Sequence, residues 1–154
     1  MSNELTINQK VTGSENIRWD LTDLFIGADD PKINESLALS SDRAVAFKHK
    51  YKSKVSDLTT LDLNHAYTEL IEVFEPIYRV HQFGSLSLST NTSDDAIKSL
   101  SARTEETLSS ISNKILFFSL ELAERDDLET LENMPDLRTS NIILTKHTKR
   151  RSTT

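Results

Sequence analysis

Apolar residues recur three or four positions apart in three long segments of this 154-residue chain, and short polar breaks separate the segments. Such spacing places side chains on one face of an α-helix, whereas a half-buried strand alternates apolar and polar residues. The length fits a single domain, and an apolar fraction of 36% allows only a small core. The predicted fold class is therefore all-α, with three long, antiparallel helices and a short C-terminal helix.

The first helix is predicted to begin at Asp29-Asp30-Pro31, because Asp is a favoured N-cap and Pro suits the first helical position. Its apolar stripe consists of Ile33, Leu37, Ala44, Phe47, Tyr51 and Val55. Before this helix we expect a short anchor segment without helical period. Its apolar residues are Trp19, Leu21, Leu24, Phe25 and Ile26.

The second helix follows a break over residues 57–60, and Pro76 lies inside it. Its predicted stripe consists of Leu63, Tyr67, Leu70, Ile71, Phe74, Ile77, Tyr78 and Val80. An interior Pro removes one backbone hydrogen bond, so a kink or a two-part helix is expected. Residues 85–89 alternate Ser and Leu as a strand would, but no partner strand is visible. The helix is therefore predicted to continue to about Leu88.

The third helix is predicted over residues 94–124, with a hydroxyl cap before it and two acidic residues in its first turn. Its stripe consists of Ile97, Leu100, Leu108, Ile111, Ile115, Phe118 and Leu122. Many Ser and Thr residues occupy its interior, which indicates a polar face or a mildly polar helix–helix contact. A short fourth helix is expected over residues 128–133, ending near Pro135.

Composition excludes several classes of chemistry. The chain has no Cys, so it has neither a disulfide, a thiolate nucleophile nor a Cys-ligated zinc site. Its only glycines are Gly13, Gly27 and Gly84, which rules out a P-loop or a dinucleotide fingerprint. No apolar run is long enough to span a membrane, and the N-terminus has no signal-peptide pattern. A cytoplasmic location is therefore expected.

No catalytic, cofactor-binding or metal residue is assigned from the sequence. The four histidines are His49, His65, His81 and His147, and no pair has the i, i+4 spacing of H-E-x-x-H. His65 and Glu69 lie four residues apart, but two ligands do not make a site, and a solvated helix face is the favoured interpretation. The acidic row Glu69, Glu72 and Glu75 is likewise interpreted as a solubilising face rather than as paired acid and base catalysts.

The last nine residues form a basic tail that contains Lys146, Lys149, Arg150 and Arg151 and no acid. Such a tail can attract nucleic acid or anionic lipid. The whole chain has a net charge of −6. Its acidic remainder argues against nucleic acid and membranes as partners. The predicted organisation is a flexible N-terminus over residues 1–15, a helical lobe over 16–135 and a basic, disordered tail over 136–154.

One resemblance adds to this interpretation. The segment N-I-R-W-D-L-T-D-L-F over residues 16–25, followed by Asp29-Asp30-Pro31, resembles the start of oligoendopeptidase F-type zinc metallopeptidases, in the thimet-like oligopeptidase superfamily. The resemblance continues through residues 47–54, Gly84, residues 91–95 and residues 111–122, and it covers about residues 16–135. The order and spacing of these pieces carry the likeness more than any single piece does.

The resemblance implies a mostly helical, cytosolic family of much longer enzymes that cleave short peptides internally. Their zinc is held by the two His of H-E-x-x-H and a downstream Glu, all in a C-terminal catalytic domain. This chain lacks that motif, so zinc is expected only in a full-length parent enzyme and no site residue is transferred. We expect a truncated N-terminal fragment, inactive alone, with apolar faces left exposed, including parts of the stripe from Ile111 to Leu122. Its implied partner is the missing catalytic domain or another helical protein, and short peptides are substrates only of the parent. The alternative is a stand-alone helical interaction module that binds through its amphipathic stripes.

Overall fold

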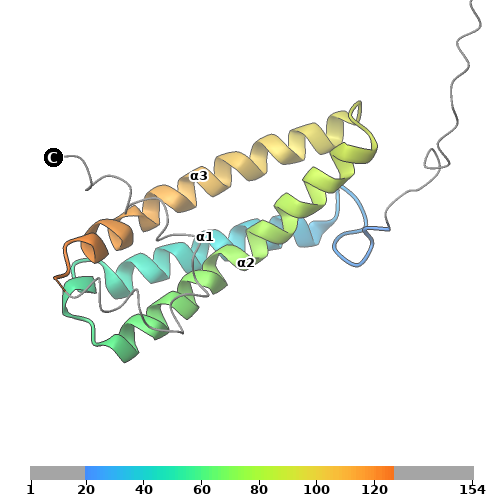
Figure 1. Cartoon of the computed structure of the whole chain (residues 1–154). Coiled ribbons are helices and arrows are strands. Elements are labelled where there is room, and N and C mark those ends of the chain that lie inside the picture. The colour runs from blue at the N-terminus through green and yellow to red at the C-terminus, as the bar shows by residue number, and fades with distance from the viewer. Residues whose placement is uncertain (1–19, 127–154) are drawn as a thin grey trace, which may run out of the picture.

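The computed structural model describes residues 20–126, which form three long helices in an elongated bundle (Figure 1). The elements are α1 (Pro31–Tyr51), the short 3-10 helix η1 (Val55–Asp57), α2 (Thr60–Thr90) and α3 (Asp95–Ala123). Consecutive helices run in opposite directions, as Figure 1 shows, and the described residues contain no strand. The all-α prediction with three long helices is thus confirmed. The predicted fourth helix and Trp19 lie outside the described residues.

The start of α1 follows the prediction closely. Asp30 is the N-cap, and Pro31 is the first helical residue. The two Asp30 carboxylate oxygens accept hydrogen bonds from the Lys32 and Ile26 backbone N–H groups, each at 3.0 Å. Phe25 of the anchor segment is buried, but Ile26 is 83% exposed, so the prediction that Ile26 anchors the chain is wrong. The same turn that aims Phe25 inward directs its neighbour to solvent.

The substitution Asp30→Asn is expected to make stability less dependent on pH. The N–H groups of Ile26 and then of Lys32 hold the pKa of Asp30 below its usual value. A lowered pKa in the folded state contributes stability above the pKa of the unfolded chain, and this contribution disappears as pH falls through the folded pKa. The variant should therefore melt below the wild type at pH 7, and the gap should shrink below about pH 4. Thermal melts of the wild type and the variant, at pH 7 and below about pH 4, measure this difference in melting temperature. Asp29→Asn, at an exposed position, serves as the control, and a gap that is constant with pH would contradict the prediction.

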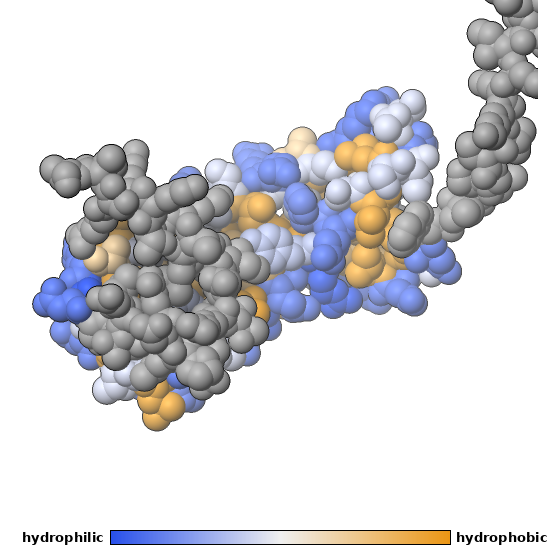
Figure 2. All heavy atoms as spheres, viewed as in Figure 1, coloured by the Kyte–Doolittle hydropathy of each residue, from blue (hydrophilic) through white to orange (hydrophobic). Residues whose placement is uncertain are grey.

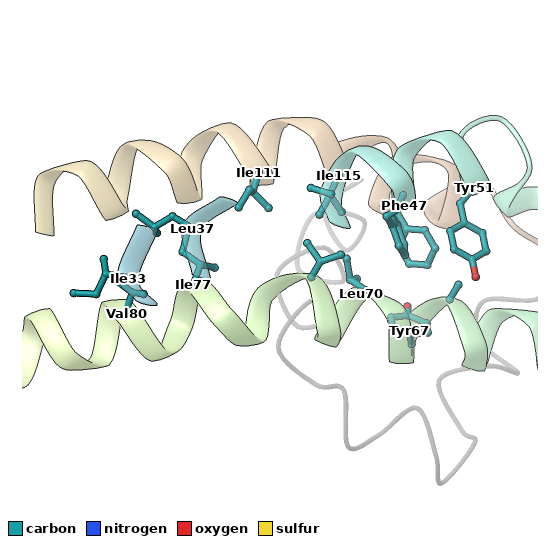
Figure 3. Packing of buried hydrophobic residues seen from close by; sticks show 14 of the residues in the cluster. Ile33, Leu37, Phe47, Tyr51, Tyr67, Leu70, Ile77, Val80, Ile111 and Ile115 are labelled. Atoms are coloured by element: carbon teal, nitrogen blue, oxygen red, sulfur yellow. The ribbon is translucent and has the colours of Figure 1, made fainter. Parts of the chain in front are cut away.

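The core lies along the axis where the three helices meet, and Figure 3 shows its side chains converging from all three. Five of the six residues in the predicted α1 stripe belong to α1 and are buried, and the sixth, Val55, is buried in η1 instead. Helix α1 ends earlier than the stripe because Ser53 takes a left-handed backbone conformation with φ 65°. In α3 every predicted stripe residue is buried except Leu108, which is half-buried against the core.

The predicted α2 stripe is partly wrong. Leu63, Tyr67, Leu70, Ile77 and Val80 are buried as predicted. Ile71 and Tyr78, however, are 58% and 44% exposed. The buried face turns instead toward residues that the stripe left out, which are Ala66, Val73, Pro76, Phe83 and Gly84. Two neighbouring helices cover only part of the α2 circumference, so a wide apolar stripe keeps one edge in solvent.

Helix α2 runs without interruption past Pro76 to Thr90, and Figure 1 draws it as one bent ribbon. The two-part alternative is therefore wrong, whereas the helical assignment of the Ser–Leu alternation is confirmed. Near its end α2 comes close to α3, because a Cβ added at Gly84 would lie 3.0 Å from the Ser101 hydroxyl oxygen. The hydroxyl-rich surface of α3 thus includes a helix–helix contact.

Helix α3 begins at Asp95, one residue later than predicted. Its N-cap is Asp94, whose carboxylate accepts hydrogen bonds from the N–H groups of Ala96 and Ile97. The predicted hydroxyl cap is therefore wrong, and only Asp95 is an acid within the first turn. Farther along, the buried Thr104 hydroxyl donates to the Leu100 carbonyl, which explains how a polar side chain is accommodated in the core.

Candidate functional site

Pro76 is accommodated by two side chains of α1. Because Pro has no N–H, the Glu72 carbonyl loses its helical donor, and Arg43 donates to that oxygen from its guanidinium at 2.6 Å. One residue later, the Ile77 N–H donates to the hydroxyl oxygen of Ser40 at 3.1 Å. Ser40 is completely buried, and this bond satisfies a polar group that burial would otherwise penalise. The Pro76 turn of α2 is thus also a hydrogen-bonded contact with α1.

The connection between α1 and α2 is held by the end of α3. The Glu121 carboxylate accepts hydrogen bonds from the Ser53 and Val55 N–H groups, at 2.8 and 3.2 Å. One turn later, the Arg125 guanidinium donates to the carbonyls of Val55 and Leu58, at 2.7 and 2.8 Å. Glu121 near the end of α3 and Arg125 just beyond that end therefore bind the N–H and C=O groups of one loop. This arrangement stabilises the bundle and provides no reactive group.

Two residues of the acidic row, Glu69 and Glu75, form ion pairs at the surface. Glu69 pairs with Lys50 across the α1–α2 contact, and Glu75 lies 3.8 Å from Arg79 on its own helix. His81 lies 3.2 Å from Glu105 of α3, whereas His65 has no ion pair with Glu69. Among residues 20–126 no group of three or more His, Cys, Asp or Glu side chains is arranged to hold a metal ion.

The outer side of α2 carries the clearest candidate for a binding surface. Ile71, Phe74 and Tyr78 follow one another at helical spacing and form what we call the α2 apolar strip. Ile71 and Tyr78 are exposed, and the Phe74 and Tyr78 rings stack with centroids 5.5 Å apart. Figure 2 shows apolar atoms at the surface over α2 and α3, among polar ones. Neighbouring apolar side chains left in solvent are typical of a surface that binds a partner.

The exposed apolar residues of α3 differ from those expected. Ile111, Ile115, Phe118 and Leu122 are all buried within the bundle, so the expectation that this stripe is exposed is wrong. Leu116 and Leu120 are exposed instead, at 51% and 54%, and lie one turn apart. Substitution of Ile115 or Phe118 would therefore destabilise the core rather than test a binding surface. The α2 apolar strip is the better target.

Within the described part of the chain, no helix is long and apolar enough to cross a membrane. The basic tail, with His147, lies outside the described residues. Comparisons of the sequence and the structure with protein-family models, curated proteins and solved structures found no match.

Proposed function

We propose that this chain is the non-catalytic N-terminal helical lobe of an oligoendopeptidase F-like zinc metalloendopeptidase. Two sets of residues support the proposal. The segments at residues 16–25 and 29–31 resemble the start of such enzymes, and Asp30 and Pro31 of that match start the first helix of the bundle. The bundle itself packs around its own core, as a separate helical lobe would.

The lobe acts by docking on a catalytic domain through the α2 apolar strip. The observation that carries this step is the exposure of Ile71 and Tyr78, next to the partly buried Phe74, on a helix whose other face is completely packed. Docking would remove these side chains from water, and each square ångström of apolar surface buried contributes about 25 cal/mol. In the parent enzyme zinc and short peptides would bind the catalytic domain. The lobe would form one wall of the substrate cleft, opposite that domain. A cytoplasmic location accompanies this proposal.

Docking on a catalytic domain is expected to depend on the α2 apolar strip. The test mixes the purified chain with a separately produced H-E-x-x-H domain of an oligoendopeptidase F-type enzyme and measures the dissociation constant by titration calorimetry. Ile71→Asp combined with Tyr78→Asp should weaken binding by about tenfold or more, because charges replace buried apolar atoms. Leu61→Asp is the matched control, since Leu61 is 67% exposed on the same helix but outside the strip.

Three outcomes of this titration would contradict the proposal. They are no binding by the wild-type chain, an equal loss in the Leu61→Asp control, and full binding by the strip variant. The stand-alone interaction module remains the second candidate, and the same strip is its natural surface. The interaction module is favoured if the wild-type chain binds another helical protein, the strip variant does not, and neither chain binds the catalytic domain.

A further inference from the structure

A groove of about 570 Å³ lies between α1 and α3, close to the end of α1. Six residues line it, and they are Val45, Lys48, His49, Lys52, Ser53 and Lys114. Three of the six are lysines, one is His49, and none is acidic. This composition is unusual for a chain whose net charge is −6. The groove is therefore a positively charged site on a protein whose net charge is negative.

Within the described residues, the three groove lysines form no ion pair, whereas two of the four other lysines do. Lys50 pairs with Glu69, and Lys98 lies 3.0 Å from Asp95. No carboxylate of residues 20–126 forms an ion pair with Lys48, Lys52 or Lys114. The Lys114 ammonium instead donates to the Ser110 hydroxyl at 3.1 Å. No ion pair within this part of the chain therefore neutralises the positive charge of the groove.

One acid close to the groove is engaged by backbone N–H groups. Glu121 lies beside Ser53 at the rim of the groove, but its two oxygens accept hydrogen bonds from the Ser53 and Val55 N–H groups. It therefore lowers the net charge near Ser53 without pairing with a groove lysine.

The helix macrodipole explains the position of only some of the cations in the groove. Cations are stabilised near a helix C-terminus, and Lys48 and His49 occupy the last turn of α1. Lys52 is already the C-cap residue, and Lys114 lies in α3 more than two turns before Ala123. Because the effect falls off within one turn, it does not account for a lysine contributed by α3. Two helices that run in the same direction bring these cations together across one groove.

We infer that this groove binds a compact anion that carries several phosphate groups. Each lysine ammonium is a point charge with three donors, which suits phosphate oxygens in several orientations. Planar carboxylates are best recognised by the paired N–H groups of arginine, and no arginine lines the groove. The volume is within the range of small-molecule sites, and Lys48 and Lys52, one turn apart, face Lys114 across it. The inference is independent of the docking surface on α2.

Calorimetric titration of the full chain with inorganic tripolyphosphate, at about 20 mM salt, tests the inference because low salt leaves these attractions unscreened. The groove variant combines Lys48→Gln, Lys52→Gln and Lys114→Gln, and its affinity should fall by about tenfold or more. The matched control combines Lys32→Gln, Arg79→Gln and Lys98→Gln, which removes the same charge outside the groove. Its affinity should stay within about twofold of the wild type.

Two further measurements extend this test. One uses a second ligand to identify the class of anion, and the other uses a single-site variant in case the triple variant misfolds. Adenosine triphosphate carries the same phosphates, so tighter binding than tripolyphosphate indicates a nucleotide, and equal binding indicates recognition of the phosphates alone. Lys52→Glu, at an exposed position, should weaken binding several-fold even if the triple variant fails to fold.

Four results would overturn the inference. The first is no binding by the wild type, and the second is unchanged binding by the groove variant, which would place the anion elsewhere, for instance on the basic tail. The third is an equal loss in the matched control, because the attraction would then come from the overall charge. The fourth is tighter binding of a hexaglutamate peptide than of tripolyphosphate, which would make the groove a site for acidic polypeptides.

Discussion

Replacement of Phe118 by Ala is expected to destabilise the protein by about 3–5 kcal/mol. The Phe118 side chain is completely buried, and its ring lies 5.3 Å from that of Phe47 and 5.5 Å from that of Tyr67. It therefore joins α3 to both other helices at one point of a small core. Truncation removes apolar burial and leaves a cavity that rigid neighbours fill only in part. Urea unfolding followed by circular dichroism measures the loss.

Two further readouts make this prediction specific. Leu120→Ala, at a position that is 54% exposed on the same helix, should change stability by no more than about 0.5 kcal/mol. Burial raises the pKa of Tyr67 to about 12 in the intact core. If Phe118→Ala admits water to the cavity, the pKa of Tyr67 should move back toward 10, which ultraviolet titration detects. Equal losses at residues 118 and 120 would contradict the packing described for α3.

Ser40→Ala is expected to cost about 1–3 kcal/mol, although it removes a single oxygen atom. The Ser40 hydroxyl oxygen accepts the Ile77 N–H bond in a completely buried contact, and Ala leaves that N–H without this acceptor. Unfolding in urea gives the loss. Ser36→Ala is the control, because the exposed Ser36 hydroxyl only donates to a carbonyl of its own helix, and its removal should have little effect.

A double-mutant cycle with Pro76→Ala tests the reason for this cost. Alanine at position 76 can donate to the Glu72 carbonyl and lets α2 close its own hydrogen bonds. The Ser40→Ala penalty should then fall by about 0.5 kcal/mol or more. Additive losses would show that Ser40 stabilises the bundle for a reason unrelated to Pro76.

Local sequence was sufficient to locate the helices. Asp30 and Pro31 start α1 through interactions that span only a few residues, and Thr59 caps α2 in the same way through the Asp62 N–H. The buried faces of α1 and α3 were predicted because the apolar stripe on each is narrow. On α2 the apolar residues cover a wider arc, and only the placement of the neighbouring helices decides that Ile71 and Tyr78 stay in solvent.

Contacts between distant residues could not be predicted in this way. The donor that rescues the Glu72 carbonyl comes from Arg43, 29 residues earlier, and Glu121 reaches the Ser53 N–H across 68 residues. Neither pair has a signal in local spacing. The basic groove was missed for the same reason, since Lys114 lies in a different helix from Lys48 and Lys52 and only packing brings them together.

We propose that this chain is a lobe without catalytic residues of its own, and a peptidase assay tests this proposal most directly. Purified chain is incubated with a mixture of short peptides and added zinc, with and without a chelator, and the products are identified by mass spectrometry. We expect no internal cleavage of the peptides under either condition. Cleavage that requires zinc, is abolished by the chelator and persists after removal of contaminating proteases would contradict it.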